Sequence, residues 1–469
     1  MGKMPLEQAR RGIHVFTGVA SNHIHRARIL CESLKRHHPE FCFHLALADK
    51  VPQELECRKE PFDSIIGVES LDIPNRTGWI FSHNITELCT AIKPFVLRRL
   101  LQLDDCQQVY FFDADIVLFD AIDELIEMLD TCNIILTPHL TSPETTLEAI
   151  VDNEICSLRH GIYNLGFLGV RNEPETRRFV DWWAHRLYHF CREALDMHLW
   201  TDQKWINHVP VFFDGVRIVK SSRFNVAPWN ITTRRLEGSF EKGFTVDGEP
   251  LAFYHFTGFD SGAHKIMAEK YAPGNPAVES LIDWYQRANK RDRDPARDTP
   301  WAYSAFENGE PITRLHRLIY RWRKDLQEAY PNPFEVKPGV KSYYDWFRWC
   351  AAVEYPSLSS ELLRAASAGE DSQSGDRSQA AVTEGGRVDK YHLRAVLDGL
   401  NYPQAGSLVR IAKSLLLVQH YAAWTRFHYQ HQGLRGVLAR VRRTVRRVLF
   451  GGRPREAASP LGRQSHNQH

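Results

Sequence analysis

Residues 109–117 read VYFFDADIV, an apolar run that ends in two closely spaced acids. In an extended chain, residues i and i+2 point to the same side, so Asp113 and Asp115 face together at the end of a buried strand. Two converging carboxylates repel each other and raise each other's pKa unless a cation lies between them. Oxygen ligands suit Mg²⁺ or Mn²⁺, so the pattern predicts a divalent metal site. The alternative is a strand end whose two solvated aspartates begin a turn.

Outward from this stretch, the first half of the chain alternates strand-like and helix-like segments, which favours an α/β sheet covered by helices. Further strands are expected at 12–17, 41–48, 64–68, 163–170 and 251–256. Helices are expected from about His23, over 88–101 and over 176–195. The second of these has a capping-box pattern, Asn84 followed by Glu87, and Pro94 as a kink or break.

Composition excludes several classes of protein. The chain has 469 residues, of which 43% are hydrophobic and 25% charged, as in globular proteins rather than disordered or collagen-like ones. The net charge of +2 does not favour a nucleic-acid partner, and none is expected. The nine cysteines include no CxxC pair, and the start has no apolar signal-peptide core. These features predict a reduced, cytoplasmic protein, with peripheral binding to the inner membrane face as a further option.

Four further residues each allow two interpretations, one as part of a binding site and one as an ordinary structural residue. His255 follows the apolar run LAFY and is either a ligand that favours Mn²⁺ over Mg²⁺ or an ordinary hydrogen-bonded histidine. Gly166, inside a strand pattern, indicates either the close approach of a ligand or another backbone, or a bulge. Asn164 binds either a sugar hydroxyl or neighbouring backbone. Asp202 precedes a helical pattern and either caps it or contacts a ligand.

Taken together in their order, these segments resemble the GT-A-fold glycosyltransferases, and within them the family 8 retaining enzymes, the glycogenin and lipopolysaccharide galactosyltransferase group. The resemblance covers about residues 12–270. It rests on the Asp113-Ala114-Asp115 motif and on four companions: the opening strand and helix at 14–39, Ala91-Ile92-Lys93-Pro94, Tyr163-Asn164-Leu165-Gly166-Phe167 with Asp202-Gln203, and His255-Phe256-Thr257-Gly258. The family often follows its His-x-x-Gly closely with Lys-Pro, whereas here the nearest lysine is the displaced Lys265.

The resemblance implies a role for each matched residue. The metal ligands are Asp113, Asp115 and His255, and the catalytic residues near the donor sugar are Asn164, Asp202 and Gln203. The donor is expected to contact Thr17, Asn22, Lys93, Asp113, Gly166, Gly258 and Lys265. For Lys93, the alternative is an ordinary solvated charge on a helix.

The implied activity is metal-dependent transfer of a sugar, with retention of configuration, from a nucleotide sugar such as a UDP-sugar to a glycan or glycolipid acceptor. Synthesis of cell-surface polysaccharide or lipopolysaccharide is one such setting. Growing negative charge on the leaving diphosphate is what a divalent ion stabilises. Two alternatives remain: a haloacid-dehalogenase-like phosphatase with Asp113 as nucleophile, whose later GDxxxD motif is missing after residue 115, and a non-catalytic membrane-surface protein.

The rest of the chain is expected to be helical. We expect a GT-A-like catalytic domain at 1–270, an aromatic-rich helical extension at 271–365, a flexible linker at 366–387 and a helical segment at 388–469. Residues 431–455 carry eight Arg and no acid, so the remainder of the chain is net negative. Within them, residues 434–450 have an apolar face and an Arg-rich face, which suits an anionic membrane surface; a helix docked on the protein is the alternative.

Overall fold

The computed structural model describes residues 12–293, 300–351 and 354–355. Contacts along the chain divide it into Met1–Ala395 and Val396–His469, and all described residues belong to the first unit. The expected linker at 366–387 and the basic segment at 434–450 lie outside the described residues. Among those described, no helix has both the length and the apolar composition that crossing a membrane requires.

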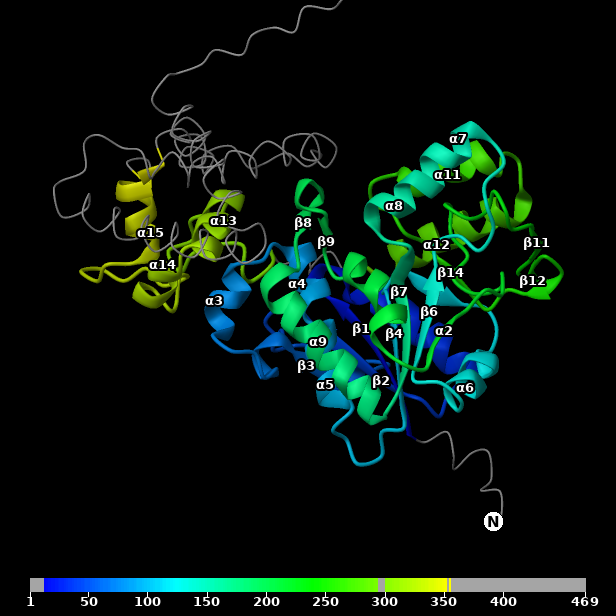
Figure 1. Cartoon of the computed structure of the whole chain (residues 1–469), viewed down its shortest axis with the longest axis horizontal. Coiled ribbons are helices and arrows are strands. Elements are labelled where there is room, and N and C mark those ends of the chain that lie inside the picture. Colours follow the sequence, from blue (N-terminus) through cyan, green and yellow to red (C-terminus); the bar gives the residue numbers. More distant parts are fainter. Residues whose placement is uncertain (1–11, 294–299, 352–353, 356–469) are drawn as a thin grey trace, which may run out of the picture. The chain divides into compact units, whose positions relative to one another are not determined.

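A seven-stranded mixed sheet forms the centre of the described region, so the predicted α/β class with flanking helices is confirmed (Figure 1). The strand order is β10-β6-β7-β4-β1-β2-β3. Strand β7 runs antiparallel to both of its neighbours, β4 and β6, whereas β4, β1, β2 and β3 run parallel. The bounds are β1 Ile13–Val19, β2 Cys42–Leu47, β3 Ser64–Gly67, β4 Gln108–Phe112, β6 Ile134–Pro138, β7 Tyr163–Arg171 and β10 Val216–Ile218.

Helices cover both faces of this sheet. Because successive side chains of a strand point to opposite faces, neighbouring residues of β4 belong to different cores. Phe111 belongs to the core that β4 shares with α5 (Lys93–Leu100) and α9 (Pro174–Phe190). Its neighbours Tyr110 and Phe112 belong to the opposite core, with α2 (Ile24–His37) and α6 (Asp123–Leu129). Both faces of β4 are therefore buried, as its unbroken apolar run predicts.

The remaining strands are short and form three separate small sheets. Strand β5 (Ile116–Leu118) pairs antiparallel with β14 (Phe253–His255), which joins the segment after the two acids to a distant part of the sequence. The strands β11 (Leu236–Ser239), β12 (Gly243–Val246) and β13 (Glu249–Pro250) form a second antiparallel sheet. The pair β8 (Glu193–Ala194) and β9 (Leu199–Trp200) forms a short hairpin. The sequence interpretation missed these short strands except β14, which lies within the strand expected at 251–256.

Two expected helices have different ends in the structure. The capping box of Asn84 and Glu87 is present and begins α4 (Ile85–Ala91), but the helix breaks there, and Pro94 lies in the first turn of α5. A proline is tolerated in a first turn because no intrahelical donor is needed. The helix expected over 176–195 ends at Phe190 as α9, since residues 193–194 pair as β8.

The remaining helices follow the sheet. They are α3 (Arg76–Phe81), α7 (Leu147–Ala149), α8 (Cys156–His160), α10 (Val209–Phe212), α11 (Ala263–Tyr271), α12 (Pro276–Asp292), α13 (Arg314–Trp322), α14 (Lys324–Ala329) and α15 (Tyr343–Trp346). Single-turn elements include the π-helices Ile150–Ile155 and Phe347–Ala351 and the 3₁₀ helix Gln203–His208. The described part of the expected extension at 271–365 is largely helical. It packs on α3 through the buried Arg317, whose guanidinium donates to the carbonyls of Phe81 and His83 at 2.8 Å each.

Candidate active site

The two acids lie where β4 leaves the sheet. Asp113 follows the last residue of β4, and its backbone N–H donates to Gly166 O on β7 at 2.8 Å. A turn follows, closed by the bond from Ile116 N to Asp113 O at 3.0 Å, and β5 begins. The side chains of Asp113 and Asp115 are 36% and 21% exposed, so both carboxylates are reachable from solvent.

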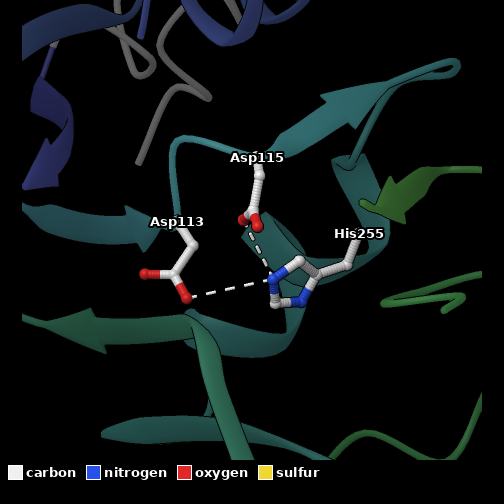
Figure 2. A group of neighbouring side chains, drawn as sticks. All are labelled: Asp113, Asp115 and His255. Carbon is white, nitrogen blue, oxygen red and sulfur yellow. Dashed lines mark ion pairs between the residues drawn. The ribbon is translucent and has the colours of Figure 1, made fainter. Parts of the chain in front are cut away.

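His255 meets these acids from the other end of the sequence. In the β5–β14 pair, His255 lies opposite Ile116, which directly follows Asp115. Its Nε2 is 3.0 Å from Asp115 Oδ1 and 3.9 Å from Asp113 Oδ2 (Figure 2). One ligand atom from each of the three residues lies within 4.8 Å of the others. The three residues expected to bind metal thus converge, although their sequence separation is large.

Asn225 fixes which nitrogen of His255 faces the acids. The Asn225 amide donates from Nδ2 to Asn164 Oδ1 at 3.0 Å and to Thr137 Oγ1 at 3.3 Å, which leaves its Oδ1 as an acceptor. That oxygen is 3.2 Å from His255 Nδ1, so Nδ1 carries the proton and Nε2 presents its lone pair to the acids. A second hydrogen bond of this kind is what orients metal-binding histidines.

Gly166 is required by the same histidine. A Cβ built at residue 166 would lie 2.3 Å from His255 Cε1 and 2.7 Å from Asn164 Oδ1. The close approach predicted at this glycine is real, but the approaching group is the imidazole of His255 rather than a backbone. Gly166 therefore allows β7 and β14 to hold the histidine against the sheet edge.

Lys93 is buried among three oxygens, so its interpretation as a solvated helix charge is wrong. Its Nζ lies 2.8 Å from Asp202 Oδ2, 3.5 Å from Asp113 Oδ1 and 3.1 Å from the Leu165 carbonyl oxygen. Asp202 does not cap the helix that follows it, and its other oxygen accepts from Thr201 Oγ1 at 3.0 Å. The lysine therefore bridges Asp113 to Asp202, and the capping interpretation of Asp202 is also wrong.

The charges of these groups depend on one another. Burial works against the charged form of His255, but the neighbouring Asp115 outweighs it and raises the pKa of the imidazole. Burial raises the pKa of Asp113. The positive charge of Lys93 lowers this pKa in part, and the negative charge of Asp115 raises it further. Burial also acts on Asp115, but His255 and Arg26 together hold the pKa of this carboxyl below its usual value. Of the two acids, Asp113 is therefore the one that lacks compensating positive charge, which is the situation that a divalent ion relieves.

Asn164 and Gln203 lie beside this group but bond within the protein. The Asn164 amide oxygen accepts from Gly166 N at 3.0 Å, as in the interpretation in which it holds neighbouring backbone. Gln203 accepts from Leu165 N at 3.0 Å and donates to the His160 carbonyl at 3.2 Å. Both side chains connect β7 to the segments around it. Their expected catalytic roles remain predictions.

The other expected donor contacts are placed differently. Thr17 is fully buried in β1, and its hydroxyl has no hydrogen-bond partner in the described part of the chain, whereas Asn22 is exposed just after that strand. Gly258 adopts a left-handed φ of 68° in the turn after β14. Lys265 is 71% exposed on α11 and pairs with Glu269 at 3.6 Å, so the structure does not bring it to the acids.

Two residues of the site were not found from the sequence. Asn225 is fully buried with a φ of 54°, and Arg26 on α2 is buried and paired with Asp260. An asparagine that tolerates a left-handed backbone is a weak signal, because most such residues simply form turns. Arg26 lies in a helix rich in basic residues, so nothing in its neighbourhood sets it apart.

The donor set fits a divalent cation. Two carboxylates and one neutral imidazole nitrogen converge, the imidazole is oriented by a second-layer amide, and solvent reaches one side. Oxygen ligands alone suit either Mg²⁺ or Mn²⁺, and the imidazole favours Mn²⁺. Asp113, Asp115 and His255 would hold the ion, and the sites left open would be free for ligand oxygens.

Comparisons with known proteins give distant similarities. No family model matches the chain. It is 28% identical over 324 residues to the uncharacterized protein YfnD of Bacillus subtilis (strain 168), covering 68% of this chain and 92% of YfnD. Among solved structures, it is similar to the galactosyltransferase LgtC in complex with donor and acceptor sugar analogs, at 16% identity and a TM-score of 0.38, covering 60% of this chain and 95% of that one. It is also similar to mouse xyloside xylosyltransferase 1, at 15% identity and a TM-score of 0.31, covering 52% and 97%.

Proposed function

We propose that this protein is a glycosyltransferase that moves a sugar from a nucleotide sugar, in the first place a UDP-sugar, to a glycan or glycolipid acceptor. The observation that carries the proposal is the convergence of Asp113, Asp115 and His255 at the carboxyl edge of a mixed α/β sheet, with Lys93 beside them. This is the arrangement that a diphosphate bridged by a metal ion needs. The family 8 resemblance of the sequence supplies the choice of sugar transfer.

The residues of the chain divide the work of the reaction. A divalent ion held by the two acids and His255 supplies positive charge that stabilises a leaving diphosphate. Asn225 keeps the Nε2 lone pair of His255 directed at that position. Lys93 holds Asp113 and Asp202 in fixed orientations and adds a second positive charge beside the acids. Asp202 and Gln203 are the groups assigned to the donor sugar near the reacting carbon.

The finer parts of the proposal follow the same reasoning. Manganese is the favoured ion because an imidazole completes the ligand set. Retention of anomeric configuration, a role in cell-surface polysaccharide or lipopolysaccharide synthesis, and peripheral binding to the inner face of a membrane through residues 434–450 are proposed from the sequence. The domain division into a catalytic part at 1–270 and a helical extension is proposed likewise.

Titration calorimetry with nucleotides tests the donor assignment. We expect UDP to bind the purified protein in the presence of Mn²⁺ and to bind far more weakly after chelation. A screen of sugar nucleotides for Mn²⁺-dependent hydrolysis then identifies the sugar, because many transferases slowly hydrolyse their donor. GDP or CDP serves as the matched control, since each carries the same diphosphate with a different base.

Two outcomes would contradict the proposal. UDP binding that does not change when Mn²⁺ is removed would rule out the metal-bridged diphosphate. Rapid hydrolysis of p-nitrophenyl phosphate, lost in Asp113→Asn, together with no action on sugar nucleotides, would favour the phosphatase alternative. Tighter binding of GDP than of UDP would change the nucleotide only and leave sugar transfer in place.

A further inference from the structure

A second cleft lies away from these acids, between α3, the end of α9 and the pair α13–α14. Its volume is about 760 Å³, within the range of sites for small molecules. Its walls come from segments far apart in the sequence, at 75–83, 188–192 and 320–331. None of these residues belongs to the group around Asp113.

Aromatic rings form the walls of this cleft and are held in place. The rings of Trp79 and Tyr188 stack at 6.3 Å and 13°, and Trp79 Nε1 donates to the Tyr188 carbonyl at 3.0 Å. Trp322 and Phe190, at 42% and 37% exposed, present open ring surface. Large aromatic surface left exposed at the rim of a cleft is a typical binding feature rather than a core feature.

Cationic side chains also line this cleft, next to the aromatic rings. The Arg192 guanidinium is buried and lies 4.3 Å from the Trp322 ring centre and 5.8 Å from that of Phe190. Lys324 and Arg76 also line the cleft, whereas Glu328 is the acid among its lining residues. Arg321 is there as well, but Glu87 beneath it balances its charge. Among the described residues that line the cleft, cations outnumber acids.

The field of these cations is felt by a neighbouring histidine. Burial lowers the pKa of His189, and the positive charges of His185, Arg192 and Lys324 lower it further. An anion in the cleft would relieve this repulsion. The Arg192 guanidinium lies close to two rings and donates from Nη2 to the His189 carbonyl at 2.7 Å, and a guanidinium pairs well with a carboxylate or phosphate.

We propose that this cleft binds an anionic saccharide. Sugar rings present apolar C–H faces that stack on exposed aromatic rings, and their carboxylate or phosphate groups would pair with Arg192 and Lys324. The choice of a saccharide over other anions rests on the proposed function. The segment that carries Arg192 is linked to the proposed transfer site, because Thr201 N donates to Arg192 O at 2.8 Å and Thr201 Oγ1 to Asp202 Oδ1 at 3.0 Å.

Calorimetry with tetragalacturonate on the full chain tests this inference, without nucleotide or metal. We expect saturable binding that is at least about tenfold weaker for the methyl ester of the same tetramer, which has the same rings and no charge. Trp322→Ala is expected to weaken tetragalacturonate binding at least about tenfold, and Lys324→Ala about threefold. The matched controls are Trp349→Ala, at an exposed tryptophan outside the cleft, and Lys242→Ala, at an exposed lysine; both should bind as the unchanged protein does.

Three outcomes would overturn the inference. The first is no binding of tetragalacturonate at millimolar concentration. The second is equal binding by Trp322→Ala, which would assign the polyanion to another basic region such as residues 431–455. The third is tighter binding of tetra-adenylate than of tetragalacturonate with the same loss in Trp322→Ala. Failure of the glycosyltransferase proposal would instead appear as loss of Mn²⁺-dependent UDP binding, which this experiment does not involve.

Discussion

Histidines are buried at the amino ends of two central strands and, on the separate strand β14, beside the carboxyl end of β4, and their surroundings differ at the two places. At the amino ends, His14 Nδ1 is 2.9 Å from His44 Nε2, and His44 Nδ1 is 2.6 Å from Ser64 Oγ. Each imidazole there has a neutral partner, and His14 Nε2 also lies 3.4 Å from Oδ1 of the exposed Asp105. Beside the carboxyl end of β4, His255 contacts the neutral Asn225 amide through Nδ1 and faces two carboxylates through Nε2.

The difference shows in the direction of the pKa shifts. Burial lowers the pKa of His14 and, together with the neighbouring His14, lowers that of His44 to about 4. Against the same effect of burial, Asp115 raises the pKa of His255. At the amino edge the two imidazoles thus bond to each other and to Ser64, with Asp105 nearby. The carboxyl edge instead gathers two acids around one imidazole and Lys93, and this is where we place the proposed cation.

Breaking the charge bridge at the carboxyl edge should have the largest effect. Lys93→Met leaves the buried Asp202 and the neighbouring Asp113 without their shared cation. Removing one partner of a buried ion pair costs about 3–5 kcal/mol, so we expect the free energy of unfolding in urea to fall by about that amount. The double variant Lys93→Met, Asp202→Asn should recover a large part of it. A loss below about 1 kcal/mol in the single variant would show that the bridge is not important for stability.

Neutralising one metal ligand should affect turnover next most strongly. Asp115→Asn removes a charge with little change of shape, and we expect Mn²⁺-dependent hydrolysis of the sugar nucleotide to fall by about 10²–10³-fold. The melting temperature should change little, because the variant also removes repulsion from Asp113. Asp104→Asn, at an exposed aspartate far from the site in the sequence, should behave as the unchanged protein. Near-normal turnover in Asp115→Asn would remove the metal role.

Acid should weaken the amino edge. The pKa of His44 is about 4 in the folded protein against 6.5 ordinarily, so between these values the unfolded chain binds more protons. The free energy of unfolding therefore falls as pH falls from about 6.5 to 4, with His44 contributing up to about 3 kcal/mol. The groups facing it are His14, Asp63, Asp105 and Lys35. Urea unfolding across this range should be less pH-dependent in His44→Gln, whereas His185→Gln, at an exposed histidine, should keep the original slope.

Removing the amide that orients His255 should have the smallest of these effects. Asn225→Gly keeps the left-handed backbone but loses the bond to His255 Nδ1. Second-layer partners of metal ligands are worth about 10–100-fold in metal affinity, so the Kd for Mn²⁺ should rise by that factor. The control is Asn75→Gly, which makes the same change at another left-handed asparagine. Equal Mn²⁺ affinity in both variants would show that the orientation does not depend on Asn225.

The sequence predicted the parts of this molecule whose causes are local. The apolar run before Asp113 predicted a buried strand, and the spacing of the two acids predicted their convergence. The capping box of Asn84 and Glu87 predicted the start of α4. Each of these depends on side chains within a few residues of one another, and such patterns are the ones a single sequence carries.

What the sequence did not predict depends on contacts across the fold. Lys93 stands among helical residues, and only the approach of Asp202 and β7 buries it. Asn225 acts through Asn164 and His255, 61 and 30 residues away. The strands β11 to β13 are two to four residues long, too short for a clear alternation of apolar and polar residues. Tertiary contacts, rather than local preference, decide these features.

The fit between Gly166 and His255 also has a consequence for how relatives of this chain vary. Because even a methyl group at position 166 would occupy the volume of the imidazole, the two positions cannot change independently. A relative with a larger residue in place of Gly166 must have lost or moved the histidine, and with it one ligand of the proposed cation. The pair is therefore a marker by which members that retain the cation site can be sorted from those that have kept only the sheet.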